Sequence, residues 1–281
     1  MKPKFKFEEW DCADSKSAAI EVQLNNNLIE QLNNQSVQDL ILRYTYITPK
    51  QIQTVLERDP RIRSVLRGHG IDIGGGIGCV SSALSNFVEV ETIICLDISI
   101  MAVTVGQRRV LDWDKNAISK KVVSVVGNFD NLELMDSTLD FAIAWDSLHH
   151  SDSLERTLLE LHRVLKTGGH VVIVDRAHSD ETTTEHLEKL MNIEYSKEFK
   201  DANFIQSDQI VTRRDNGEHE YRLIDWETNA NRSGFTVNTC VCIGPKKSKL
   251  NDLENLFVPF SLGGFDDARV VMVLSKTGDS V

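Results

Sequence analysis

The fold prediction rests on residues 71–78, which read Ile71-Asp72-Ile73-Gly74-Gly75-Gly76-Ile77-Gly78. The apolar residues at the start of this stretch indicate a buried parallel strand, and the run Ser81–Leu84 behind it indicates the start of a helix. A glycine-rich turn between a strand and a helix lets the backbone approach a ligand closely and directs free helix N–H groups toward it. We therefore predict a ligand site at the end of this strand, with a purely structural turn as the alternative.

The spacing of the glycines excludes two common nucleotide-binding motifs. A dinucleotide fingerprint has the form Gly-x-Gly-x-x-Gly, and counting from Gly74 and Gly76 its third glycine falls on Cys79. A P-loop ends in Gly-Lys-Ser/Thr, which is missing here. The last glycine lies instead at Gly78, so the pattern is Asp-x-Gly-x-Gly-x-Gly.

Further apolar runs are typical of strands that alternate with helices. The run Thr92–Asp97 ends in an acid about 20 residues beyond the glycines, where nucleotide-binding folds place a carboxylate on the ribose hydroxyls. A cap of the next helix is the other interpretation of Asp97. The remaining predicted strands are Lys121–Val126, Phe141–Trp145, His170–Asp175, Phe235–Ile243 and Ala268–Leu274, with a helix at Leu154–Leu165.

Two later segments complete a resemblance to a known family. They read Ser147-Leu148-His149-His150 and Arg163-Val164-Leu165-Lys166-Thr167-Gly168-Gly169. With the glycine motif, they resemble the class I S-adenosylmethionine-dependent methyltransferases over roughly residues 65–176. The resemblance implies an α/β fold, with a doubly wound, mostly parallel seven-stranded sheet that has an antiparallel edge hairpin. It also implies S-adenosylmethionine as the cofactor and S-adenosylhomocysteine as the product.

The same resemblance assigns the cofactor contacts. The glycine loop is expected to wrap the methionine part, with Asp72 at its amino end and Asp97 on the ribose. Asn128 stands where the family usually has an acid that contacts adenine, and its side-chain oxygen can still accept a hydrogen bond. The expected cofactor-binding residues are Asp72, Gly74, Gly76, Gly78, Asp97, Ile98, Asn128, Phe129 and Trp145.

The catalytic prediction concerns two histidines and an aspartate. Methyl transfer from a sulfonium is an in-line displacement, for which the protein supplies proximity, alignment and a dry site. Removing a proton from an oxygen or nitrogen acceptor suits a histidine or a carboxylate. His149, His150 and Asp175 follow the fourth and fifth strands at one sheet edge, and resemblance to sugar and natural-product O-methyltransferases implies a catalytic role for them. We expect at least one of the two histidines only to hold the turn, and His178 and His219 are weaker candidates.

The segments on either side of the motifs are interpreted as covers of the site. Residues 1–60 are predicted to form an N-terminal helical cap, with a capping box that starts a helix at Thr48. Residues 61–281 are predicted to form the methyltransferase domain. An acidic insertion at about 177–220 is predicted as a lid, with a helix at Thr182–Lys200 and a tight turn at Asn216-Gly217. No metal site is predicted, because no ligand spacing is diagnostic among His178, Glu181, Glu185, His186, Glu218 and His219.

Composition narrows the class of acceptor. The net charge of −11 argues against binding to phosphate backbones, and the five cysteines lack a Cys-x-x-Cys pair, which indicates free thiols in a reducing cytoplasm. No signal peptide or membrane-spanning run is visible.

We therefore expect a cytoplasmic enzyme, without nucleic-acid or membrane partners, that O-methylates a small sugar-like or natural-product-like acceptor. A homodimer is left open. The alternatives are a methyltransferase of RNA or protein, and a cofactor-binding member without chemistry. Lys246, Lys247 and Lys249 form an anion-binding cluster or a solvated loop.

Overall fold

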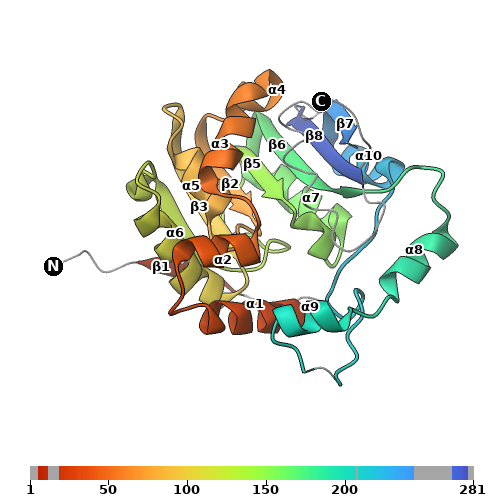
Figure 1. Ribbon diagram of the computed structural model, residues 1–281. Helices are drawn as coiled ribbons and strands as arrows, with labels where there is room; N and C mark the ends of the chain where they lie inside the picture. Colours follow the sequence, from red (N-terminus) through yellow and green to blue (C-terminus); the bar gives the residue numbers. More distant parts are fainter. Residues whose placement is uncertain (1–5, 12–18, 207, 244–267, 278–281) are drawn as a thin grey trace.

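An eight-stranded sheet forms the centre of the molecule (Figure 1). The computed structural model describes residues 6–11, 19–206, 208–243 and 268–277, so the lysines at 246–249 lie outside the described residues. The strand order is β1-β4-β3-β2-β5-β6-β8-β7. The strands are β1 (Phe7–Glu9), β2 (Gly68–Ile73), β3 (Val90–Asp97), β4 (Val122–Val126), β5 (Leu139–Trp145), β6 (Leu165–Ala177), β7 (Phe235–Ile243) and β8 (Ala268–Lys276).

The mostly parallel sheet with an antiparallel edge hairpin is confirmed. Strands β1 to β6 pair in parallel, and β8 pairs antiparallel with both β6 and β7. The predicted count of seven was one too low, because β1 pairs with β4 through Phe7 and Ser124. A strand of three residues in a charged segment has too little hydrophobic alternation to be identified from sequence.

The order of the strands reverses at β2. From there the chain runs outward through β3 and β4, and then returns to the other side of β2 to form β5 and β6. In open α/β sheets, ligands bind outside the carboxyl ends of the strands at such a reversal. The carboxyl ends of β2 and β5 are followed by the glycine loop and by the histidine pair, respectively.

Helices cover both faces of the sheet, and alternate residues of each strand face opposite layers. In β5, Phe141 and Ile143 pack in one hydrophobic cluster, and Ala142 and Ala144 pack in the other. The first cluster includes residues of α1 (Ala19–Gln31), α2 (Val37–Tyr44), α3 (Pro49–Arg58), α4 (Pro60–Arg63), α5 (Cys79–Ser85), a π-helix (Ala102–Gln107) and α6 (Arg108–Trp113). The second includes residues of α7 (Leu154–Val164) and α10 (Leu223–Arg232).

The N-terminal helices share their core with the sheet. Leu40 of α2 and Ile52 of α3 belong to the same cluster as Phe141 of β5. The predicted start of α3 is confirmed, since Thr48 accepts a hydrogen bond from the Gln51 amide and Gln51 accepts one from the Thr48 amide at 3.0 Å. The division at residue 60 stays a prediction.

The segment after β6 leaves the sheet and returns to it through α10 (Figure 1). The single helix predicted at 182–200 was wrong: there are two, α8 (Thr184–Met191) and α9 (Lys197–Ala202). Between them the backbone pairs elsewhere, because Tyr195 N–H donates to the Val211 carbonyl at 2.9 Å and Ser196 caps α9. The turn predicted at Asn216-Gly217 is present, with a φ of 73° at Gly217.

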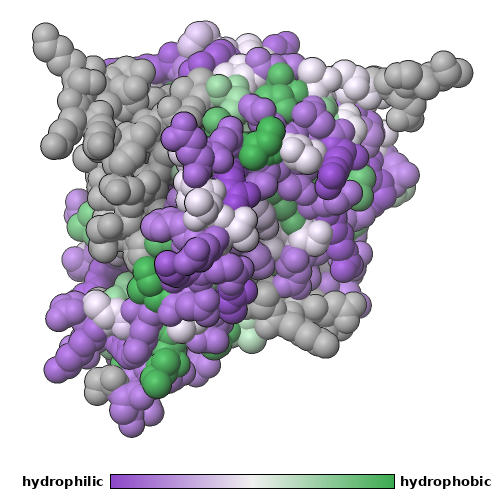
Figure 2. Space-filling model, turned by 90° about the vertical axis from the view of Figure 1, so that its right-hand side faces the viewer, coloured by the Kyte–Doolittle hydropathy of each residue, from purple (hydrophilic) through white to green (hydrophobic). Residues whose placement is uncertain are grey.

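Exposed apolar residues are dispersed over the described surface. On the face in Figure 2, hydrophilic side chains predominate and apolar ones occur in small groups. Within the described ranges, every helix is too short or too polar to cross a membrane. The hydrophobic residues are thus concentrated in the two clusters beside the sheet.

Candidate functional site

A cavity of about 450 Å³ lies at the carboxyl ends of the parallel strands. Its walls include residues of the cap helices α1 and α2, the glycine loop, the segments after β3, β4 and β5, and the insertion after β6. The cavity therefore brings together the predicted cofactor loop, the predicted catalytic residues and the two segments predicted as covers.

Glycine is required in the loop by both conformation and space. Gly74 and Gly76 have positive φ angles of 64° and 52°. A Cβ added at Gly74 would lie 2.6 Å from the Cβ of Ser147, and one added at Gly76 would lie 2.8 Å from Cε1 of Tyr44. The loop backbone thus lines the cavity with no side chain of its own in the way.

Asp72 provides a buried carboxylate behind this loop. Its residue is 1% exposed, and Ser81 Oγ donates to Oδ2 at 2.7 Å. Among the described residues, Oδ1 has no hydrogen-bond partner. Burial raises the pKa of Asp72 to about 7, even though the bond from Ser81 lowers it. A cationic group that reached Oδ1 would stabilise the ionised carboxylate, which fits the ammonium group of S-adenosylmethionine.

Asp97 connects the loop to the helical segment that follows β3. Its Oδ2 accepts the Gly76 N–H and its Oδ1 accepts the Ser99 N–H, both at 2.8 Å. Burial raises the pKa of this carboxyl to about 6, against the effect of the two hydrogen bonds. Since each carboxylate oxygen has a further lone pair and the residue lines the cavity, the geometry allows both the turn-holding role and contact with a ribose.

The other expected cofactor residues divide into two groups. Ile98, Asn128, Phe129 and Trp145 line the cavity. Asn128 Oδ1 already accepts the Asp130 N–H at 2.9 Å, so one lone pair is left for an adenine amino group. Gly78 differs from the rest, because it is the N-cap of α5 with a φ of 84° and faces Gln107. A glycine is favoured at position 78 because the residue that begins α5 has a positive φ.

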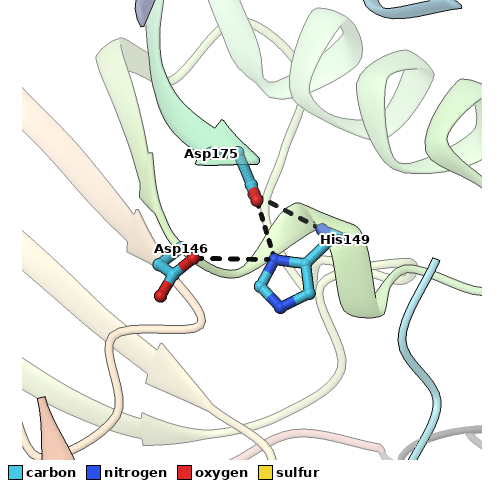
Figure 3. Close-up of side chains that lie close together, drawn as sticks. All are labelled: Asp146, His149 and Asp175. Atoms are coloured by element: carbon cyan, nitrogen blue, oxygen red, sulfur yellow. Dashed lines mark hydrogen bonds and ion pairs between the residues drawn. The ribbon is translucent and has the colours of Figure 1, made fainter. Parts of the chain in front are cut away.

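His149 and Asp175 form a buried pair at the same edge (Figure 3). His149 Nδ1 lies 2.7 Å from Asp175 Oδ1, and the two residues are 1% and 0% exposed. Asp175 Oδ2 accepts the N–H groups of Ser147 and Leu148 at 3.2 and 2.8 Å, which fixes the turn that carries the histidine.

This pairing determines the protonation state of the histidine. An ionised carboxylate can only accept, so His149 Nδ1 carries the proton and the lone pair is at Nε2. Burial lowers the pKa of His149, which keeps the ring neutral near pH 7. Although burial opposes it, the pairing with His149 keeps the pKa of Asp175 below its ordinary value. Nε2 is buried without a hydrogen-bond partner among the described residues.

His150 is bound to the cap. Its Nδ1 lies 2.9 Å from Glu21 Oε2 of α1, and its ring is 4.1 Å from that of His149, centroid to centroid. Burial lowers the pKa of His150, but Glu21 outweighs burial and raises it overall. A raised pKa favours the protonated ring, which has no lone pair to accept a proton, whereas His149 is kept neutral, so the geometry favours His149 as the general base.

A metal ion is disfavoured by the partners of the acidic side chains. Asp146, His149 and Asp175 offer ligand atoms within 4.8 Å of one another. However, Asp146 Oδ1 lies 3.0 Å from Arg269 Nη1 and 3.4 Å from Arg176 Nε, and His149 Nδ1 is bonded to Asp175. The two arginines lower the pKa of Asp146 and neutralise the charge that a divalent cation would need.

The insertion supplies wall residues that the sequence did not identify as functional. Tyr195, Asn216 and Glu218 line the cavity beside Arg176, as do Glu21 and Tyr44 from the cap. His219, a weaker catalytic candidate, donates its backbone N–H to the His149 carbonyl at 2.8 Å. His178 is paired with Glu220 at 2.5 Å. A long separation in sequence, without a motif, hides such residues from sequence analysis.

Comparisons with known proteins identify a methyltransferase domain in the central part of the chain. Residues 71–173 match the family described as a methyltransferase domain. A sterol 4-C-methyltransferase of Caenorhabditis elegans is 29% identical over 131 residues, covering 46% of this chain and 38% of that protein. A demethylmenaquinone methyltransferase of Bacteroides fragilis is 28% identical over 110 residues, covering 39% of this chain and 44% of that protein. The chain thus spans less than half the length of these curated relatives.

A solved structure agrees in fold. The geranyl diphosphate C-methyltransferase of Streptomyces coelicolor A3(2), in complex with Mg²⁺, geranyl-S-thiolodiphosphate and S-adenosyl-L-homocysteine, superposes with a TM-score of 0.54 at 14% identity. The superposition covers 81% of this chain and 76% of that chain. With the glycine loop, Asp72 and Asp97 placed as described, the chain contains a methyltransferase domain of the class I S-adenosylmethionine-dependent fold.

Proposed function

We propose that this chain transfers the methyl group of S-adenosylmethionine to a hydroxyl group of a small molecule, with His149 as the general base. The observation that carries the proposal is the buried His149–Asp175 pair in the wall of the cavity that also contains the glycine loop. In this proposal, Asp72 Oδ1 receives the ammonium group of the cofactor and Asp97 the ribose hydroxyls.

The chemistry follows from the tautomer of the histidine. S-adenosylmethionine supplies an electrophilic methyl group. His149 Nε2 accepts the hydroxyl proton while the acceptor oxygen bonds to the methyl carbon, whose bond to the sulfonium sulfur would break to leave S-adenosylhomocysteine. Asp175 holds the ring and stabilises the imidazolium that forms, as the carboxylate does in other His–Asp pairs. The proton then leaves to solvent, which restores the neutral ring.

Access to the base requires movement of the insertion. Nε2 is shielded from solvent, and the His219 N–H is bonded to the His149 carbonyl at 2.8 Å. Residues 177–220 therefore act as a lid that opens for the acceptor and excludes water when closed. A small molecule suits a cavity of about 450 Å³ enclosed by both the cap and this lid.

Carbon methylation is a second candidate. Relatives named as C-methyltransferases favour it, among them the sterol enzyme and the geranyl diphosphate enzyme. The same base could remove a proton from an acidic carbon. NMR of the methylated product distinguishes the two, because an O-methyl and a C-methyl group differ widely in chemical shift.

The test uses His149→Gln and Asp175→Asn, with the exposed His186→Gln as a matched control. Turnover is measured as S-adenosylhomocysteine release with pools of hydroxylated small molecules, and cofactor affinity by calorimetry. We expect His149→Gln to lower turnover by about 10²–10⁴-fold while cofactor affinity and the control stay unchanged. Normal turnover in His149→Gln contradicts the assignment of the base, and an absence of cofactor binding in the unsubstituted protein contradicts the proposed function.

A further inference from the structure

The lid wall of the cavity is built on buried ion pairs. Glu218 Oε2 lies 2.6 Å from Arg176 Nη1 and 2.9 Å from Arg213 Nη2. Arg213 also contacts Glu220, which is paired in turn with His178. The side chains of these five residues are at most 11% exposed. Because the charges are matched with one another, the carboxylates of this wall are already engaged in the closed arrangement.

Tyr195 and Asn216 extend this network toward the cavity. The two arginines outweigh burial and hold the pKa of Glu218 well below its ordinary value, so the carboxylate carries no proton. The Tyr195 hydroxyl must therefore donate to Glu218, and its oxygen accepts from Asn216 Nδ2 at 3.3 Å. This sequence of donors fixes the Asn216 amide, because a flipped amide would place two acceptors against each other.

The fixed orientation leaves one hydrogen-bond acceptor unused. Within the described part of the chain, Asn216 Oδ1 is buried and has no hydrogen-bond partner, and the residue is 7% exposed and lines the cavity. Asn216 precedes His219 by three residues, and the His219 N–H is bonded to the His149 carbonyl. The lid segment that carries Asn216 is thereby joined to the turn that carries His149. Both residues line the cavity, and His149 Nε2, like Asn216 Oδ1, has no hydrogen-bond partner among the described residues.

We infer that the methyl acceptor carries a second hydrogen-bond donor beside the reacting hydroxyl, and that Asn216 is the residue that selects for it. The inference rests on the proposed function, since the first donor is the hydroxyl that His149 deprotonates. Diols, catechols and amino alcohols have this pattern. A site whose buried polar atom is left unpaired by a ligand rejects that ligand strongly.

The test measures binding, so it needs no turnover. Catechol, 2-aminophenol and 1,2-cyclohexanediol are compared with their mono-O-methyl derivatives, each in the presence of S-adenosylhomocysteine, by ligand-observed NMR. In the unsubstituted protein we expect about a five- to hundred-fold weaker Kd for the derivatives, the usual effect of leaving one buried group unpaired. In Asn216→Leu this preference should disappear. In Tyr195→Phe it should shrink, because this variant keeps the Asn216 side-chain oxygen but removes the hydroxyl that orients the Asn216 amide. Asn231→Leu, an exposed position on α10, should keep it.

Separate outcomes distinguish the two levels of the proposal. If S-adenosylhomocysteine does not bind to the unsubstituted protein by calorimetry, the proposed function fails. If it binds but none of the two-donor probes does, or if they bind no better than their derivatives, the inference is overturned and the proposed function stands. Retention of the full preference in both Asn216→Leu and Tyr195→Phe also overturns it. Melting temperatures of all variants confirm that each is folded.

Discussion

Asp72→Asn should make the cofactor-free protein more stable at high pH while it weakens cofactor binding. In the native protein the pKa of Asp72 is raised by burial to about 7, against an ordinary value of 3.8. Between these values the native state holds a proton that the unfolded chain has released. The free energy of unfolding therefore falls as the pH rises from about 4 to about 7, and this contribution is constant above that range.

The magnitude follows from the gap between the two pKa values. It corresponds to about 4 kcal/mol at pH 8, of which about 3 kcal/mol is lost between pH 5 and pH 8. Asparagine keeps the oxygen that accepts from Ser81 Oγ, but its amide nitrogen takes the place of the unpartnered Oδ1. An unpaired buried amide costs about 1–3 kcal/mol at any pH. The net gain at pH 8 is thus about 1–3 kcal/mol, and it should vanish or reverse at pH 5.

Urea unfolding of the cofactor-free protein at pH 5 and pH 8 measures this effect. The difference between Asp72→Asn and the unsubstituted protein should change by about 3 kcal/mol between the two conditions, whereas the exposed Asp112→Asn should show no such change. Other titrating groups are common to the proteins and cancel. The reasoning is refuted if the difference in free energy of unfolding between Asp72→Asn and the unsubstituted protein is the same at both pH values. That result would mean that the buried carboxyl ionises without penalty.

Two further predictions concern Asp97 and His149. Asp97→Ala should weaken S-adenosylhomocysteine binding by about 1–3 kcal/mol, the cost of a lost charged hydrogen-bond partner, and calorimetry with unchanged affinity would leave Asp97 only as a support of the turn. Because burial lowers the pKa of His149, turnover at saturating substrate should rise with pH through a midpoint below 6.5 and then stay level. A midpoint above that value, or a pH-independent rate, would contradict a role for neutral His149 as the base.

The sheet could be predicted from sequence because its signals are local. Strands β3, β5 and β6 each contain a continuous apolar run, and the glycine loop follows β2 directly. The antiparallel edge hairpin came from the family resemblance. What failed was the short strand Phe7–Glu9 and the break between α8 and α9, both of which depend on pairing with distant segments: β4 in the first case and residues 211–213 in the second.

Only the site residues that belong to recognisable sequence motifs could be predicted. Asp72 and Asp97 lie at the carboxyl ends of β2 and β3, and the histidine pair follows β5, so their common edge was predictable. Asp175 was expected to assist one of the two histidines, but the sequence did not indicate that it contacts His149, nor that Glu21 of the cap contacts His150. The sequence does not distinguish two adjacent histidines. Their contacts in the structure do: the partner of His149 makes it a candidate base, and the partner of His150 links it to the cap.

The two covers of the cavity meet at this pair of histidines. The cap reaches the His150 side chain through Glu21, and the lid reaches the His149 backbone through the His219 amide. In the proposed mechanism, a displacement of either cover would therefore alter the surroundings of His149, because the two imidazole rings are 4.1 Å apart. Asp175 counters such displacements, since it accepts N–H groups from the turn as well as from the His149 ring. In the proposed mechanism, the carboxylate that sets the tautomer would thus also hold the position of His149 while the covers open for the acceptor.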